Sequence, residues 1–226
     1  MTDKLSDKQR LRIQTRHRVS IENHGYQPQA LYWSNREIQE VRFQNLINIL
    51  DASYFDSDKA CSILDVGCGF ADLYHYLKKQ CVSPDYMGID ISPDIVRGAI
   101  AQTPDVQIFE GELSDFKFSD GQFDYVLLSG ALNEVVETEV EGTLELQGSY
   151  AKSVIKSMYR LCERGVAFNL LDRRNAWFDN RLDLQSFYPD EIIDFCQTFA
   201  GKVTLVEGYL DNDFTIYLTK RKSANL

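Results

Sequence analysis

Apolar residues near the start of the chain recur with the spacing of a helix. The segment Ser34-Asn35-Arg36-Glu37 has the form of a capping box, with Ser34 at the N-cap and Glu37 at N3. The positions that then share one apolar face are Ile38, Val41, Leu46, Ile49 and Leu50. This pattern predicts that residues 1–60 are mainly helical and pack on the rest of the protein.

From residue 61 onward, short apolar runs alternate with helical segments. The runs that predict strands are 61–66, 86–91, 106–109, 123–129 and 165–171. Helices are predicted over 70–80 and 150–162, and at Ser92-Pro93 and Pro189, where proline suits the first helical position. Strands separated by helices indicate a parallel sheet with helices on both faces.

The last two apolar runs, 203–208 and 214–220, are separated by only a short Asp-Asn-Asp turn, so they should pair antiparallel. We therefore predict a doubly wound α/β fold, with a mostly parallel seven-stranded sheet, an antiparallel C-terminal hairpin strand and additional N-terminal helices. Residues 1–58 would form a helical segment and partial lid, and residues 59–226 the ligand-binding domain.

Composition is that of a folded protein, since 44% of the 226 residues are hydrophobic and 12% are aromatic. No membrane-spanning run and no signal peptide are visible, which predicts a cytoplasmic protein. The five cysteines are scattered without a C-x-x-C motif, and there are only three histidines. We therefore expect reduced thiols and no bound metal.

The net charge of −10 makes nucleic acid an unlikely partner. The N-terminus is nevertheless basic, because residues 1–18 contain Lys4, Lys8, Arg10, Arg12, Arg16 and Arg18. This arm is interpreted as a solvated, partly frayed terminus; contact with phosphate or with an acidic partner is the alternative.

Candidate chemistry begins at Asp65-Val66-Gly67-Cys68-Gly69, where an apolar strand ends in an acid and a glycine turn. Glycine accepts positive φ and leaves room for a ligand. Asp90 ends the next predicted strand. A glycine turn followed by such an acid is typical of a nucleoside-binding βαβ unit.

A dinucleotide site would have a third glycine at position 72, where this chain has Asp72. A carboxylate beside a pyrophosphate is unfavourable. The turn therefore favours a nucleoside that carries no phosphate and has a positive charge.

Together with Gly111-Glu112 and Phe123-Asp124-Tyr125-Val126, these motifs resemble the class I S-adenosylmethionine-dependent methyltransferases, which have a Rossmann-like, seven-stranded fold. The order matches from about residue 60 to 172. One departure is Ala71, where that family often has a further glycine; we expect only a slight change in the turn. Asp124 is expected to be structural.

The resemblance implies S-adenosylmethionine as cofactor, S-adenosylhomocysteine as product and no metal. The turn Gly67-Cys68-Gly69 would pass under the methionine part, and Asp65 would lie near its amino group. Asp65 capping the turn is the alternative. Asp90 would accept hydrogen bonds from both ribose hydroxyls.

The same resemblance places Ile91 on the adenine face, with Glu112 and Leu113 at the adenine edge. Glu112 would accept from the exocyclic amine, unless it is simply a solvated loop acid. Ser129 and Gly130 would lie beside the sulfonium and the methionine carboxylate.

Candidate substrate contacts are Trp33, Asn133, Glu134 and Arg173. Trp33 belongs to an aromatic loop with Tyr26 and Tyr32 that either covers the sulfonium or only packs a flanking helix on the sheet. Asn133 and Glu134 follow the fourth strand and would contact the acceptor or act as a base, and Arg173 follows the fifth. Each is equally compatible with an ordinary solvated loop. The acidic stretch 134–145 is expected to be a loop, and a lid is the further hypothesis.

The segment after the fourth strand lacks the Asn/Asp-Pro-Pro-aromatic sequence that resembles enzymes methylating DNA bases and glutamine side chains. We therefore expect methyl transfer to a small-molecule acceptor. Alternatives are a protein or RNA methyltransferase, a non-catalytic cofactor-binding protein and a nicotinamide-dependent oxidoreductase, which Asp72 disfavours. Methyl transfer mainly requires alignment, so no catalytic residue is assigned. The sequence does not indicate an oligomeric state.

Overall fold

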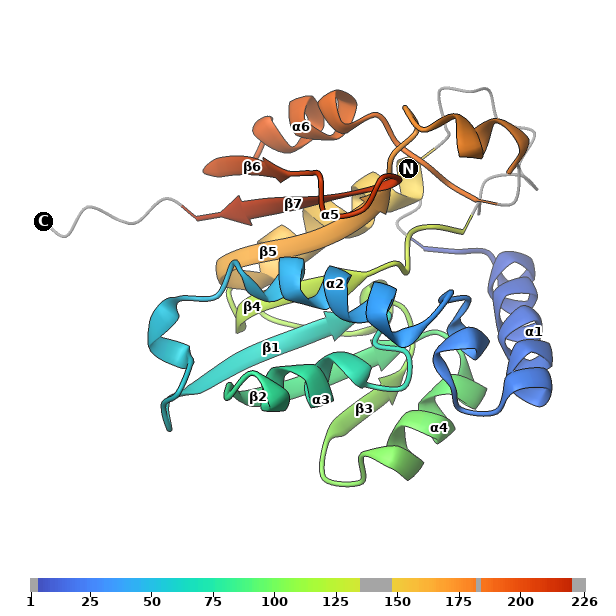
Figure 1. Ribbon diagram of the computed structural model, residues 1–226. Coiled ribbons are helices and arrows are strands. Elements are labelled where there is room, and N and C mark those ends of the chain that lie inside the picture. The colour runs from blue at the N-terminus through green and yellow to red at the C-terminus, as the bar shows by residue number, and fades with distance from the viewer. Residues whose placement is uncertain (1–3, 135–147, 182–183, 221–226) are drawn as a thin grey trace, which may run out of the picture.

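The computed structural model describes residues 4–134, 148–181 and 184–220 (Figure 1). Its strands form one sheet in the order β3-β2-β1-β4-β5-β7-β6. The strands β1 to β5 are parallel, whereas β7 is antiparallel to both β5 and β6. The strands are β1 Ala60–Val66, β2 Ser83–Asp90, β3 Gln107–Glu110, β4 Phe123–Ser129, β5 Cys162–Leu171, β6 Lys202–Val206 and β7 Asp213–Thr219. The predicted seven-stranded α/β sheet with an antiparallel hairpin is confirmed.

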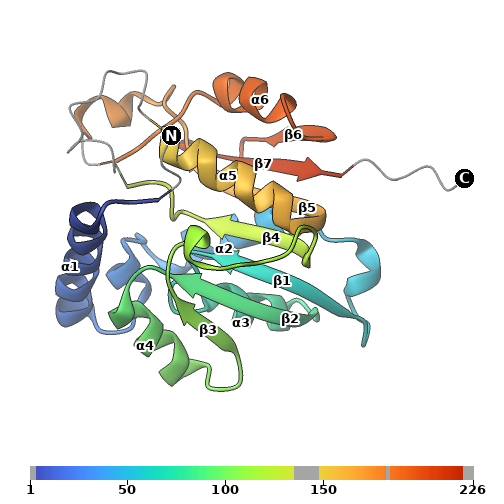
Figure 2. The same ribbon diagram turned by 180° about the vertical axis from the view of Figure 1, so that it is seen from behind.

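Helices cover both faces of this sheet, with α2, α3 and α4 on one face and α5 and α6 on the other (Figures 1 and 2). The α-helices are α1 Asp7–His24, α2 Arg36–Ile47, α3 Asp72–Lys79, α4 Pro93–Gln102, α5 Ser149–Leu161 and α6 Pro189–Gln197. Short 3-10 turns are η1 Pro28–Leu31, η2 Ala52–Tyr54, η3 Leu113–Asp115 and η6 Ala176–Asn180. The strand order reverses between β1 and β4, and ligands of open α/β sheets bind at such a point.

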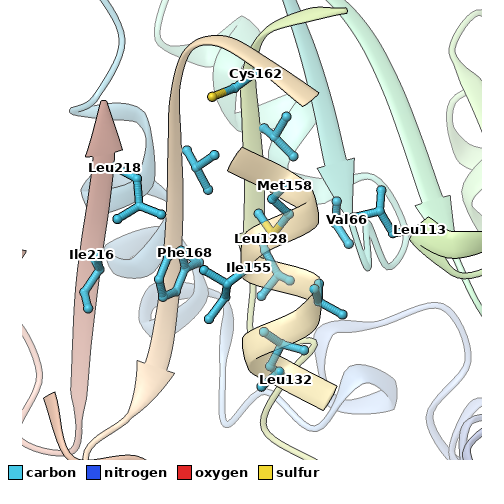
Figure 3. Packing of buried hydrophobic residues seen from close by; sticks show 14 of the residues in the cluster. Val66, Leu113, Leu128, Leu132, Ile155, Met158, Cys162, Phe168, Ile216 and Leu218 are labelled. Carbon is cyan, nitrogen blue, oxygen red and sulfur yellow. The ribbon is translucent and has the colours of Figure 1, made fainter. Parts of the chain in front are cut away.

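Each face of the sheet has its own apolar core. On one face, Ile155 and Met158 of α5 pack with Leu128 of β4 and Phe168 of β5 (Figure 3). On the other face, α2 packs on β4 and β5, α3 on β2, and α4 on β2 and β3, through a cluster that includes Phe43, Leu46, Leu77 and Ala99. The helix α2 is thus part of the sheet's core rather than a loose attachment.

Several boundaries differ from the prediction for identifiable reasons. Asn35, not Ser34, is the N-cap of α2, because its side chain accepts from the backbone N–H of Ile38 at 2.8 Å. The strand β2 begins earlier than expected and includes Pro84. Proline is tolerated at this position because β3 pairs with β2 only from Met87 onward, so the edge of β2 that would face β3 is unpaired at Pro84. The strand β5 follows α5 directly at Cys162.

The basic N-terminal arm is helical, so its interpretation as a frayed terminus is wrong for the described residues. Helix α1 opens with a capping box in which Ser6 and Gln9 bond to each other's backbone N–H groups. It lies beyond the carboxyl ends of β1 and β4 (Figure 1). No helix in the described ranges is long and apolar enough to cross a membrane. Beyond Glu134, the predicted acidic loop lies outside these ranges up to residue 147.

Candidate functional site

A cavity of about 570 Å³ opens at the carboxyl ends of β1, β2 and β4. Helix α1, the η1 segment and α2 form its outer wall. Every residue predicted to contact the cofactor lines this cavity, namely Asp65, Gly67, Cys68, Gly69, Asp90, Ile91, Glu112, Leu113, Ser129 and Gly130. The structure therefore brings motifs that are distant in the sequence to one place.

The glycine turn needs positive φ at Gly67, Gly69 and also Ala71, whose φ values are +71°, +56° and +62°. A Cβ on Gly67 would lie 2.3 Å from the Cβ of Ala131, and one on Gly69 would lie 2.7 Å from a methyl carbon of Leu31. These glycines thus permit both the backbone conformation and tight packing of the turn. Ala71 takes the left-handed conformation at the N-cap of α3, at a cost of about 1 kcal/mol.

Asp90 ties the end of β2 to the glycine turn. Its Oδ2 accepts from the backbone N–H of Gly69 at 3.2 Å, and its Oδ1 accepts from that of Ser92 at 3.0 Å. Burial raises the pKa of Asp90 to about 6, although these hydrogen bonds lower it. Ser92 stands at the N-cap of α4, yet its own side chain makes no capping bond.

Asp65 is 2% exposed and accepts a hydrogen bond of 2.5 Å from the hydroxyl of Tyr86. Burial raises its pKa to about 7, with the Tyr86 bond opposing that change and Asp90 adding to it. Tyr86 was not predicted as a site residue. Asp124, by contrast, is structural as expected, since it binds Ser62 and Arg164 at the opposite end of the sheet.

Glu112 is held by the surrounding protein instead of being solvated. Its Oε2 accepts from the backbone N–H of Leu5 and from the hydroxyl of Tyr150, both at 3.1 Å. Its other oxygen binds the guanidinium of Arg10, which also reaches Asp115 at 2.9 Å. A contact between Glu112 and adenine stays a prediction.

Helix α1 also docks on Ile91, whose carbonyl oxygen accepts from the side chain of Gln14 at 2.8 Å. Together with the bonds to Glu112, this contact places α1 directly over the residues predicted to surround adenine. Sequence reasoning missed this docking, because it depends on long-range pairs between α1 and the loops after β2 and β3.

Arg42 of α2 is the main group that the sequence did not reveal. It is 8% exposed, forms an ion pair with Asp213 and lies 4.7 Å from the ring centroid of Trp33. A Cβ on Gly130 would be 3.4 Å from its Nη1. The only sequence signal is an arginine within the buried side of an amphipathic helix.

Of the residues predicted to contact substrate, Trp33, Asn133 and Glu134 line the cavity. Arg173 is not among its lining residues, and the neighbouring Arg174 binds Asp172 and Glu207. From the same segment, the cavity is instead lined by Trp177 and Arg181.

Asp72 also has a structural role that the sequence did not show. Its carboxylate accepts from Arg36 at 2.5 Å and from Gln39 at 3.0 Å, which joins α3 to α2. In the part of the chain that the structure describes, no cluster of His, Cys, Asp and Glu is suited to a metal ion.

Comparison with known proteins identifies the fold and the chemistry. Residues 63–164 match the sequence model of a family described as "Methyltransferase domain". A protein of Mycobacterium tuberculosis named a methyltransferase is 31% identical over 171 residues, which cover 70% of this chain and 93% of that protein. The 18S rRNA (guanine-N(7))-methyltransferase of Bos taurus is 24% identical over 148 residues, 61% of this chain and 51% of that protein.

Among solved structures, magnesium protoporphyrin IX methyltransferase from Synechocystis with bound SAH has a similar fold. It superposes with a TM-score of 0.60 at 11% identity, over 84% of this chain and 89% of that chain. The present chain belongs to the class I S-adenosylmethionine-dependent methyltransferases. The predicted family, enzyme class and cofactor are confirmed.

Proposed function

We propose that this methyltransferase acts on a small-molecule acceptor held in the cavity beneath α1. The observation that carries the proposal is the cavity itself, whose 570 Å³ lies in the range of small-molecule sites. The lining of the cavity includes the aromatic residues Tyr32, Trp33 and Trp177. Aromatic walls of this kind suit an apolar or planar acceptor.

An RNA acceptor is the alternative, since one relative is named an rRNA methyltransferase. The basic arm was the only feature of the sequence that suggested RNA. In the structure at least four of its six charges pair within the protein, with Lys4 and Arg10 on Asp115 and with Arg12 and Arg16 on Glu134. Phosphate binding would have to break these pairs, so the arrangement favours the small molecule.

The residues around the cavity fit a cationic nucleoside without phosphate. The backbone at Gly67 and Gly69 has the positive φ of a close turn, and buried Asp90 faces the cavity with lone pairs left for ribose hydroxyls. Asp65 would attract the amino group, and Arg42 the carboxylate of the methionine part. When bound, S-adenosylmethionine supplies a methyl group on a positively charged sulfur.

In this account residues 1–58 form a partial lid, with α1 covering the cavity while α2 stays packed on the sheet. Arg10 and Gln14 would hold the lid closed through Glu112 and Ile91. A closed lid would exclude water from the transfer. A cytoplasmic location stays a prediction, which the five free cysteines support.

Isotope labelling of the transferred methyl group tests the proposal. The purified enzyme is incubated with S-adenosylmethionine labelled in the methyl group and, separately, with ultrafiltered metabolites, total RNA and protein of a cell extract. We expect S-adenosylhomocysteine release and label in the metabolite fraction. Label in RNA or protein would contradict the proposal. Cofactor binding without S-adenosylhomocysteine release from any fraction would indicate the non-catalytic binding protein.

A further inference from the structure

We propose that His17 contacts a hydroxyl group of the acceptor and receives its proton as the methyl group is transferred. This inference rests on the small-molecule function proposed above, because it assigns a residue to the acceptor side of the same cavity. No catalytic residue had been predicted from the sequence.

His17 belongs to α1, and its imidazole lines the cavity. Its ring centroid lies 6.0 Å from that of Tyr32, which precedes Trp33. The Tyr32 hydroxyl donates to the backbone carbonyl of Arg16 at 3.1 Å and so fixes this loop beside His17. The imidazole is therefore held on the aromatic side of the cavity, where the acceptor is expected.

The Nδ1 atom of His17 is buried and has no hydrogen-bond partner among the described residues. The other histidines differ, since His75 lies within 3.1 Å of the Thr103 hydroxyl and His24 is exposed at the end of α1. Leaving a buried polar atom unpaired is unfavourable. Because Nδ1 has almost no accessible surface, the acceptor hydroxyl would bond to the other ring nitrogen, Nε2, which is not among the buried unpaired atoms of the described residues.

The charges around His17 keep its ring neutral. Burial, with Arg16 adding to it, lowers the pKa of His17 to about 4. Glu134 pairs with Arg16 at 3.0 Å. The helix α4 also packs on α1, but its charged groups Asp94 and Arg97 pair with each other. A neutral imidazole has a lone pair that accepts a proton.

The positive charge of the methyl donor favours a hydroxyl over an ammonium acceptor. Arg16 and Arg42 line the cavity but are each paired with a carboxylate, whereas the methyl donor carries a positive charge on its sulfur. A second cation would be repelled there, whereas negative charge developing on an acceptor oxygen would be stabilised.

The atoms and charges of the step balance. The acceptor oxygen forms a bond to the methyl carbon while the carbon–sulfur bond breaks and its electron pair stays on sulfur. The oxygen keeps the electron pair of its O–H bond, and the proton passes to His17. The products are a methyl ether, neutral S-adenosylhomocysteine and an imidazolium, which then returns its proton to water.

Nitrogen NMR of histidine-labelled enzyme tests the contact without turnover. The enzyme is saturated with S-adenosylhomocysteine and titrated with phenol, its methyl ether anisole, and benzylamine. We expect phenol to shift the ring nitrogen signals of His17, while anisole, which lacks the O–H group, and benzylamine do not. His24 serves as the internal control. Equal shifts with phenol and anisole, or none with phenol, would overturn the proposal.

Kinetics with His17→Gln provide the second arm, and His24→Gln is the matched control on the same helix. With phenol, His17→Gln should lower kcat at least about 100-fold and change KM little, as expected for loss of a general base. With 4-nitrophenol, which is largely ionised near neutral pH, the loss should be small. Equal losses with both phenols would contradict a proton-accepting role. Failure of the wild type to bind S-adenosylhomocysteine would instead refute the cofactor roles proposed above.

Discussion

The backbone N–H of Gly69 donates to the carboxylate of Asp90 across 3.2 Å. This bond joins the glycine turn after β1 to the acid that ends β2. The two motifs that identify the nucleoside site are therefore one hydrogen-bonded unit, in which movement of either part displaces the other. Several consequences of this arrangement are open to measurement.

Asp90→Ala should weaken the binding of S-adenosylhomocysteine about tenfold or more. The change removes the proposed ribose partner and leaves the Gly69 and Ser92 amides unpaired, and each such loss is worth about 1–3 kcal/mol. Calorimetry measures the affinity. Asp85→Ala, at the exposed start of the same strand, should bind normally. Unchanged affinity of Asp90→Ala would refute the ribose assignment.

Gly67→Ala should destabilise the fold as well as weaken binding. The φ of +71° costs a non-glycine residue about 1–3 kcal/mol, and the added Cβ meets Ala131. Denaturant unfolding measures the decrease in the free energy of unfolding. Gly208→Ala is the control, because Gly208 has a φ of +81° but no atom within 4 Å of the added Cβ. If both variants lost equal stability, contact with Ala131 would be unimportant.

Arg10→Ala should loosen α1 and speed the release of S-adenosylhomocysteine several-fold. Arg10 joins α1 to Glu112, whose side chain is only 2% exposed, so its removal leaves a buried charge without this partner. Hydrogen exchange across residues 7–24 and stopped-flow release report the two effects. Arg18→Ala, exposed on the same helix, should change neither. Slower exchange in Arg10→Ala would contradict the lid role.

Asp65 should make the stability of the free protein fall with rising pH. Its pKa is raised to about 7 from a usual value of 3.8, so between these values the folded state holds a proton that the unfolded state has lost. The contribution is therefore present below about pH 4 and lost as pH rises through about 7. Asp65→Asn should reduce this slope without abolishing it, because the raised pKa of Asp90 gives a slope of the same sign, and Asp85→Asn should leave it unchanged. Urea unfolding at several pH values measures both.

Much of the fold follows from local patterns that a single sequence contains. The run Phe123–Ser129 is apolar on both faces because β4 is central, and it was predicted with its true bounds. The site residues of β1, β2 and β4 were also predicted, because strand ends at the switch point of a parallel sheet converge by topology. These predictions needed no long-range contact.

The site residues that the sequence did not reveal depend on tertiary contacts. His17 and Arg10 lie on a helix whose capping box, Ser6 with Gln9, was not recognised in a stretch of basic residues. Arg42 became a site residue only because α2 packs on the sheet and faces Asp213 of β7. Arg173 was expected on the cavity from its place after β5, but η6 brings Trp177 and Arg181 there instead.

A crystal structure with S-adenosylhomocysteine tests the central claim most directly. We predict that both ribose hydroxyls contact Asp90, that the adenine lies between Ile91 and Leu113, and that the sulfur faces the space enclosed by Trp33, Asn133 and His17. A nucleoside bound elsewhere, or a sulfur directed to open solvent away from α1, would contradict the account.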